Sequence, residues 1–298
     1  MIISFPIFWT EKYLKLHGKK VFVLGVNELS ECIKCRPNEI QQFRLSHYLT
    51  FIEMDQGVTV PAKATFGGVF PAAPEFIYRT IFGGVTKLGE SLNLKVGFPP
   101  AYFYPDVFDL QREVVESMSG VTKIIDVSYH IDVKDWNANS LSRGNQKKIR
   151  QCNDAGVIFK KDDLGSLSNI YSLISKNRLS KGVELSISQD QLDNAILVFP
   201  NEYELFSLYK SSTLIASAVT IMLTSTVRYV YMWADHIAYR SLSPIAMLCE
   251  EIVEDCRAKN IEVLDLGTAS LSGVLDEGLA RFKQNLGAIS TQKILYSF

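Results

Sequence analysis

The chain has 298 residues, and its 31 lysines and arginines nearly balance its 32 aspartates and glutamates, for a formal net charge of −1 at pH 7. Hydrophobic residues make up 47% of the chain and charged residues 21%, as in an ordinary globular protein. This balance argues against binding to DNA or to an anionic membrane through overall charge, although it leaves room for a local basic patch. At roughly 150 residues per domain, the length predicts two domains.

The cysteines and the apolar segments bear on the compartment. Five cysteines are few and odd in number, so we expect no disulfide framework, and Cys32-x-x-Cys35 lacks the second ligand pair of a zinc site. Residues 1–10 are apolar but have no basic start and no A-x-A site, unlike a signal peptide. Serines, threonines and an arginine interrupt the apolar stretch 214–234, which suits a strand pair. We therefore expect a reduced, cytoplasmic protein without a metal or a membrane span.

The first half of the chain ends in a regular α/β pattern. Apolar residues at helical spacing alternate with short β-type runs, and one helix has Pro105 at its first position, where proline is favoured. The predicted elements are strands over 21–26 and 64–70, a helix over 74–93, a strand over 94–98, a helix over 105–118 and a strand over 127–133.

The second half repeats that order. Ser243 and Pro244 form a helix start, with serine predicted as the N-cap, and Gly287 closes the last helix. The predicted elements are strands over 203–210, 213–223 and 227–235, a helix from 243, a strand over 261–266, a loop over 267–273, a helix over 276–287 and a final strand over 289–298.

Both halves therefore show helix, strand, loop, helix and strand, at an offset near 165 residues. This repeat predicts a duplicated α/β unit. A basic helix over 142–156 separates the two copies, and we place the domain boundary directly after it. The predicted domains are residues 1–155 and residues 156–298.

Few catalytic fingerprints are present. The patterns G-x-S-x-G, G-x-x-x-x-G-K-[ST] and G-x-G-x-x-G are absent, so hydrolase, P-loop and dinucleotide-binding functions lack their motifs. The segment 234–244 is more informative, because a strand end, a polar loop and a helix start follow one another. Unpaired N–H groups at a helix N-terminus favour an anion such as pyrophosphate.

Several segments resemble a known family. LSRGNQKKIRQCNDAGVIFK (141–160) is similar to the linker-helix motif of the FemABX and BioF2-like branch of the GNAT acyltransferase superfamily. SLSPIAMLCEEIVEDCRAKNIEVLDLGTAS (241–270) followed by GLARFKQNLGA (278–288) resembles its C-terminal pattern. FGGVF (66–70) and KVGFPPAYF (95–103) resemble the first domain more weakly.

The resemblance implies an α/β (α+β) fold of tandem duplicated GNAT-like domains, with mixed sheets flanked by helices. It implies an N-acyltransferase that moves an acyl or aminoacyl group from an activated donor to an amine on an amino sugar, amino acid or cell-envelope precursor. Acyl-CoA is the first choice of donor. The alternatives are a catalytically silent GNAT-like binding protein and an aminoacyl-tRNA-dependent transferase of the peptidoglycan type.

Two departures from the family affect these alternatives. No heptad insert corresponds to the coiled-coil arm of members that use aminoacyl-tRNA, so tRNA is the less favoured donor. The GNAT pyrophosphate loop reads [RQ]-x-x-G-x-[GA], whereas this chain keeps Arg240 but lacks both glycines. The missing glycines favour the silent binding protein, and the retained charged residues favour the enzyme.

The candidate site residues follow from this chemistry and from the resemblance. Amide formation needs a base for the amine proton, for which Asp235 and His236 at a strand end are the candidates. Lys283 matches a family lysine of the active cleft between the domains and is predicted to stabilise the oxyanion or the departing group. The donor-binding candidates are Arg240, Ser241, Leu242, Ser243 and Ile245. The substrate-binding candidates are Trp233, Asp265, Tyr102, Phe103 and Arg143.

Overall fold

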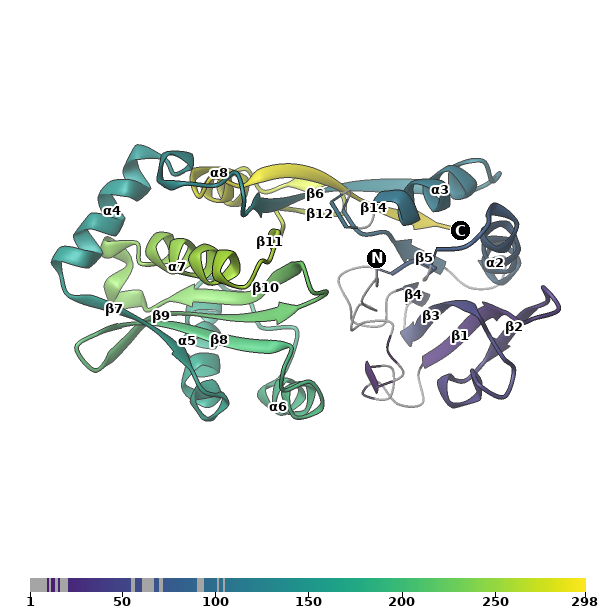
Figure 1. Cartoon of the computed structure of the whole chain (residues 1–298), viewed down its shortest axis with the longest axis horizontal. Helices are drawn as coiled ribbons and strands as arrows, with labels where there is room; N and C mark the ends of the chain where they lie inside the picture. Colours follow the sequence, from purple (N-terminus) through teal and green to yellow (C-terminus); the bar gives the residue numbers. More distant parts are fainter. Residues whose placement is uncertain are drawn as a thin grey trace. The chain divides into compact units, whose positions relative to one another are not determined.

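The computed structural model describes residues 21–54, 57–60, 67–69, 72–89, 94–100, 102–103 and 105–298, together with Thr10, Lys12, Tyr13 and Leu16. Residues 1–9, which we compared with a signal peptide, lie outside these ranges, as do residues 64–66 and 70 of the predicted strand. The described chain divides into two compact units (Figure 1). Unit 1 comprises residues 1–128, 270–275 and 291–298, and unit 2 comprises residues 129–269 and 276–290.

Among its described residues, unit 1 consists of mixed β-strands and the helices α2 and α3. Strand order in its sheet is β2-β1-β3-β4-β5-β14. The helices place their apolar stripes against aromatic and aliphatic strand residues, which form one core. The elements are β1 (Val21–Val26), β2 (Cys32–Cys35), β3 (His47–Met54), β4 (Gly57–Val60), α2 (Glu75–Gly89), β5 (Leu94–Gly97), α3 (Pro105–Glu116) and the C-terminal part of β14 (Ile289–Ser297).

Unit 2 also contains mixed β-strands, with helices on both of their faces. Figure 1 shows α7 on one face of strands β8 to β10 and α5 with α6 on the other. The elements are the end of β6 (Thr122–Asp132), α4 (Arg143–Asp154), β7 (Val157–Asp162), α5 (Leu167–Leu179), α6 (Gln189–Val198), β8 (Tyr203–Lys210), β9 (Thr213–Met222), β10 (Val227–Asp235), α7 (Ile245–Ala258), β11 (Val263–Thr268) and α8 (Glu277–Asn285).

The strands of the two units repeat one topology, which confirms the predicted duplication. The order β2-β1-β3-β4-β5 corresponds to β7-β8-β9-β10-β11. In both sets of strands the first three pairings are antiparallel and the fourth, β4 with β5 or β10 with β11, is parallel. The predicted fold class, mixed sheets flanked by helices, is therefore confirmed.

The last strand of each half ends in the unit built by the other half. β14 follows α8 of unit 2, but its residues 295–297 pair with residues 95–97 of β5 in unit 1. Conversely, β6 follows α3 of unit 1, and its residues 129–132 belong to unit 2, where β6 neighbours β11. Each unit is thus completed by a strand from the other half of the sequence.

The chain passes from unit 1 to unit 2 after Ser128, whereas we drew the domain boundary after residue 155. The difference concerns the basic helix α4, which belongs to unit 2. There Lys148 of α4 donates to the carbonyl oxygen of Ser241 at 2.6 Å, and the Cys152 thiol donates to that of Leu242. Composition alone does not reveal these tertiary contacts.

Local predictions differ from the structure in several places. Strands β2, β3, β4 and β7 were not predicted, and residues 67–69 of the predicted strand 64–70 do not form a strand. Ser243 is not the N-cap of α7, because its φ of 48° lies in the left-handed region and Pro244 occupies the cap position. The predicted loop 267–273 contains the start of a short hairpin, β12 (Ser270–Leu271) with β13 (Val274–Leu275). Helices α5 and α6 were not predicted.

Within the described residues, none of the helices combines the length and apolarity of a bilayer span.

Candidate functional site

The candidate site lies where β10 and β11 stop pairing. Their parallel register ends with Tyr229 opposite Asp265, whereas β10 continues to Asp235 and β11 to Thr268. A β-bulge directly after Val230 shifts the pairing of β10 with β9 in the same region. Bulges redirect side chains and often occur beside active sites.

Lys283 of α8 reaches the end of β11. Its side chain is only 3% exposed, and its ammonium donates to the carbonyl oxygens of Gly267 at 2.8 Å and Thr268 at 2.7 Å. An ammonium has three N–H donors, so these bonds use two. Among the described residues the third N–H has no acceptor, and the ring centre of Tyr129 lies 6.0 Å from the ammonium.

Burial gives Lys283 an unusual proton affinity. The pKa of Lys283 is lowered to about 8, mainly by burial. The charge of Asp265 acts to raise this pKa, and the charge of Arg178 acts to lower it. Because the lowered pKa still lies above 7, Lys283 is mostly protonated at neutral pH. A buried cation that is held by backbone carbonyls and can still donate is suited to stabilising negative charge that develops in a reaction.

Asp265, Gly267 and Tyr229 form the surroundings of this lysine. The Gly267 N–H donates to the buried Asp265 carboxylate at 2.7 Å. Gly267 has a φ of 75°, and a β-carbon there would lie 3.4 Å from Cε2 of Tyr229. Burial, together with the charge of Asp265, raises the pKa of Tyr229, so its hydroxyl stays a proton donor. The charge of the predicted Asp265 therefore acts on Lys283 and raises the pKa of the lysine.

Trp233 is the second predicted residue that the fold brings to α8. Its ring meets that of Phe282 edge to face, with centroids 5.9 Å apart. Phe282 precedes Lys283, so the contact links β10 directly to the helix that carries the lysine. Trp233 therefore has a packing role at the site.

A polar group fixes the C-terminal end of β10 to α5. Asn177, which is 2% exposed, donates to both the backbone oxygen and the carboxylate of Asp235, at 2.8 and 2.7 Å. The guanidinium of Arg240 lies 4.0 Å from that carboxylate and donates to Ser180 Oγ at 2.9 Å. Two predicted residues, Asp235 and Arg240, are thus brought together, by an asparagine that was not predicted.

Two further cations lie on this end of α5. Burial is the largest cause that lowers the pKa of Lys181, and the charges of Arg178 and Arg240 lower it further. The charge of Asp235 acts to raise it. Arg178 also acts on Lys283, so its charge connects the α5 end to the lysine. Among the described residues, the Arg178 side chain makes no hydrogen bond or ion pair. The run K-N-R-L-S-K-G (176–182) is the sequence signal that could have identified this group.

His236, the other predicted base, has a local role. It caps the 3-10 helix 237–242, with Nδ1 accepting from the Ala238 N–H at 3.2 Å, so the neutral ring carries its proton on Nε2. Its ring meets Tyr239 edge to face. The structure gives no contact between His236 and Lys283.

Side chains of α4 make hydrogen bonds to the backbone of the predicted donor loop. Its residues, Arg240, Ser241, Leu242, Ser243 and Ile245, span the end of the 3-10 helix and the start of α7. The α4 contacts described above occupy the carbonyl oxygens of Ser241 and Leu242. Ser243 stands where the family pattern has its first glycine, and it adopts the positive φ that glycine favours.

The remaining predicted residues lie elsewhere. Arg143 is exposed at the start of α4, with no side-chain partner given in the described chain. Tyr102 and Phe103 belong to unit 1, where Phe103 is buried and packs against Phe108 with ring centroids 6.3 Å apart. Phe103 is thus a core residue.

No group of three His, Cys, Asp or Glu side chains among the described residues could hold a metal.

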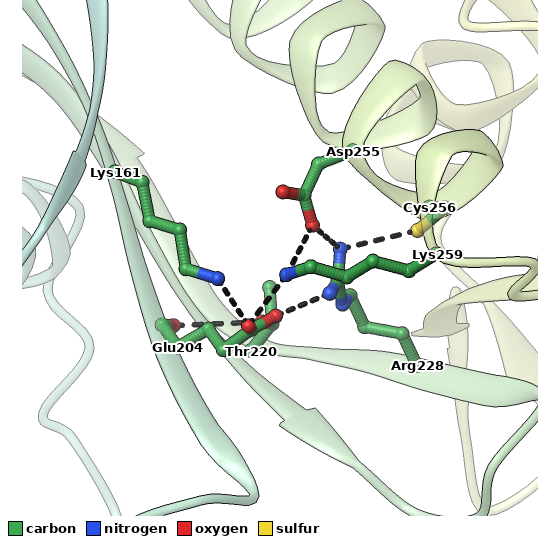
Figure 2. Close-up of polar contacts among 7 residues, drawn as sticks. All are labelled: Lys161, Glu204, Thr220, Arg228, Asp255, Cys256 and Lys259. Carbon is green, nitrogen blue, oxygen red and sulfur yellow. Dashed lines mark hydrogen bonds and ion pairs between the residues drawn. The ribbon is translucent and has the colours of Figure 1, made fainter.

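Unit 2 contains a second charged cluster, at the opposite end of β10. Figure 2 shows Arg228 between the carboxylates of Glu204 and Asp255. Lys259 lies 2.7 Å from Glu204 and 2.9 Å from Asp255, and Lys161 also pairs with Glu204. Arg228 is completely buried. This cluster joins the start of β10 to the end of α7.

Comparison with known proteins supports the family resemblance. Residues 175–294 match the model of the FemAB family, a range that includes Lys283 and the α5 end but not the helix motif 141–160. The resemblance inferred from the sequence is therefore confirmed over these residues. No curated protein sequence matches the chain significantly.

Solved structures share the fold along the whole chain. The crystal structure of FemX matches with a TM-score of 0.63 and 12% identity, covering 97% of this chain and 90% of that one. L-PGS from Bacillus licheniformis matches with a TM-score of 0.58 and 12% identity, over 99% and 93%. A conserved protein of unknown function from Bacteroides thetaiotaomicron matches with a TM-score of 0.63 and 9% identity, over 96% and 89%.

Proposed function

We propose that this chain is a transferase that moves an acyl or aminoacyl group from an activated donor to an amine in cell-envelope biosynthesis. The FemAB match and the FemX-like fold support this class. The observation that carries the proposal is Lys283, a buried ammonium inside the matched segment: two of its N–H groups donate to backbone carbonyls, and the third has no acceptor among the described residues.

The reaction needs what Lys283 can supply. The amine nitrogen attacks the acyl carbonyl carbon, a C–N bond forms, and the carbonyl electron pair moves onto oxygen. As the intermediate collapses, the bond to the thioester sulfur or ester oxygen breaks, the leaving group takes that electron pair, and the nitrogen loses a proton. The third N–H of Lys283 stabilises the negative oxygen, and its two carbonyl bonds keep the ammonium oriented.

Asp235 remains the proposed acceptor of the amine proton. Asn177 orients its carboxylate, and Arg240 lies beside it. His236 is the weaker candidate, because its unprotonated nitrogen already accepts the Ala238 N–H. We propose that the proton leaves through Asp235, directly or through water.

We propose acyl-CoA as the donor, bound along residues 240–245. Support comes from Ser243, which keeps the left-handed backbone of the family glycine, and from the retained Arg240. Aminoacyl-tRNA is the alternative donor. Both donors carry phosphates, and the cations Arg178, Lys181 and Arg240 favour phosphate without distinguishing the two. The acceptor is a small-molecule or cell-envelope precursor amine, and the expected cytoplasmic location stays a prediction.

A transfer assay tests the proposal. The full chain is incubated with a panel of acyl-CoA thioesters, or with aminoacyl-tRNAs, and a pool of amino sugars, amino acids and peptidoglycan precursors, and amide products are detected by mass spectrometry. With an accepted pair, Lys283→Met should reduce turnover by about 10²–10³. Lys259→Met, a lysine of the ion cluster in Figure 2, is the matched control and should retain turnover.

The outcomes separate the alternatives. Turnover of Lys283→Met within a few-fold of the unsubstituted chain would contradict the catalytic role. If calorimetry shows that a donor binds but no pair in the panel gives an amide product, the silent binding protein is favoured. The missing loop glycines are the sequence feature that supports this alternative.

A further inference from the structure

Apolar and basic side chains share one surface of unit 2. Three aliphatic side chains are exposed there, Leu179 by 55%, Val183 by 51% and Ile237 by 46%. Isolated exposed aliphatic residues need no explanation, but a group of them marks an interaction surface. The surface, which we call the α5 surface, comprises Lys176, Leu179, Lys181, Val183, Ile237 and Arg240.

Hydrogen bonds hold these residues together although they come from two parts of the chain. The Val183 N–H donates to the carbonyl of Arg178 at 3.1 Å, which folds the loop back onto the end of α5. The bond from Arg240 to Ser180 Oγ brings the 3-10 helix with Ile237 to the same loop. On α5, Lys176 and Leu179 are three residues apart and lie on the exposed side.

The charge of this surface is positive. Residues 175–184 contain three basic side chains and one acidic side chain, Glu184. The carboxylate of Asp235, whose charge acts on Lys181, is already engaged by Asn177 and Arg240. The overall charge of −1 therefore conceals a local excess of cations beside exposed aliphatic groups.

We propose that the α5 surface docks onto an anionic lipid bilayer. Aliphatic side chains enter the interface between headgroups and acyl chains, and lysine and arginine contact anionic headgroups, which attract basic segments. The partly exposed Tyr239, next to these groups, is a residue type favoured at that interface. An RNA partner fits less well, because bases stack on aromatic rings and the three exposed apolar groups are aliphatic.

This proposal goes beyond the proposed function, although the α5 surface shares Lys181 and Arg240 with the cations proposed to bind the donor. Vesicle binding is measured without donor and without turnover, so the two proposals can fail independently. The full chain is sedimented with vesicles of phosphatidylcholine alone or of phosphatidylcholine with phosphatidylglycerol. We expect binding only to the mixed vesicles, weakened by high salt. Lys181→Glu, and separately the double change Leu179→Ser with Val183→Ser, should each lower partitioning on the order of tenfold.

Matched controls use exposed residues elsewhere. Leu29→Ser changes a leucine of unit 1 that is 77% exposed, and it is the control for the aliphatic variant. Lys134→Glu changes another exposed lysine and is the control for Lys181→Glu. Both should leave partitioning unchanged, and circular dichroism checks that every variant is folded. Equal binding to both vesicle types, no binding, or equal losses in the controls would overturn the proposal. Binding of a bulk tRNA pool that only the α5-surface variants lose, without vesicle binding, would assign the surface to RNA instead.

Discussion

Unit 2 buries two cations, and their surroundings differ. Arg228 is fully buried between the carboxylates of Glu204 and Asp255, with lysines closing the cluster (Figure 2). Lys283 is almost as deeply buried, but its hydrogen-bond partners are two neutral carbonyls. A carboxylate neutralises a buried cation, whereas a carbonyl orients it and leaves its charge in place. The first arrangement suits a structural joint and the second a site that must meet new negative charge.

The two regions also respond to opposite ends of the pH scale. Burial acts to raise the pKa of Glu204, but hydrogen bonds from Lys161 and Lys259 and the charge of Arg228 bring this pKa below its ordinary value. The stability contributed by the cluster is therefore lost as the pH falls through that lowered pKa. For Lys283 the cost of burying a charge persists below pH 8 and is relieved above it.

The largest expected effect is on the Arg228 cluster. Arg228→Met leaves Glu204 and Asp255 partly buried with their central cation removed, so we expect a loss of about 3–5 kcal/mol in the free energy of unfolding. Urea denaturation measures it. A loss below about 1 kcal/mol would show that the flanking lysines alone neutralise the carboxylates, and the contrast with Lys283 would disappear.

A pH series on Lys283 tests the other side of the comparison. Between its lowered pKa of about 8 and its ordinary value of 10.5, the unfolded chain holds a proton that the folded chain has lost. The free energy of unfolding should therefore rise with pH in this window, by roughly 3 kcal/mol if the window is completed. Denaturation of the unsubstituted chain and of Lys283→Met from pH 7 to 10 isolates this term, which the variant should lack.

Glycine substitutions separate backbone strain from site geometry. Gly267→Ala and Gly156→Ala both place a β-carbon at a positive φ, of 75° and 69°, so each should cost about 1–2 kcal/mol of stability. Gly267 also supplies a carbonyl to Lys283 and contacts Tyr229, whereas nothing lies within 4 Å of a β-carbon at Gly156. We expect only Gly267→Ala to lower turnover in the transfer assay. Equal turnover of the two variants would argue against a site at the end of β11.

The smallest effect should come from Lys259→Met. Lys259 is 37% exposed and shares both its carboxylates with Arg228. Exposed ion pairs contribute about 0–1 kcal/mol, so its stability should change by no more than that. Thermal denaturation would reveal a larger loss, which would make the lysine an essential member of the cluster.

Much of the fold could be predicted from local patterns. The strands 203–210, 213–223 and 227–235 and the paired helix–strand–helix–strand series agree with the structure to within a few residues. These signals are local, because apolar spacing, proline at a helix start and Gly287 after a helix act over single turns. Helices α5 and α6 were missed, and with them Asn177, Arg178 and Lys181.

The candidate site residues were predicted from two sources: Lys283, Asp265 and Arg240 from the family pattern, and Asp235 and Trp233 from their place at the end of a predicted strand. Lys283, Asp265 and Trp233 are indeed gathered around the end of β11 and α8, and Asp235 and Arg240 lie together at the end of β10. Phe103, by contrast, is a core residue of unit 1. A buried aromatic and a ligand-binding aromatic have the same pattern in a sequence, and only packing distinguishes them.

By itself, the sequence determined the elements, the repeat and the resemblance, because each depends on residues close together in the chain. Only the tertiary structure decided which strand completes which sheet and what surrounds each buried charge. β14 ends in unit 1 and β6 in unit 2, and Lys283 meets carbonyls where Arg228 meets carboxylates. These outcomes depend on contacts between residues far apart in the sequence, where desolvation and hydrogen bonding, rather than local propensity, set the energy.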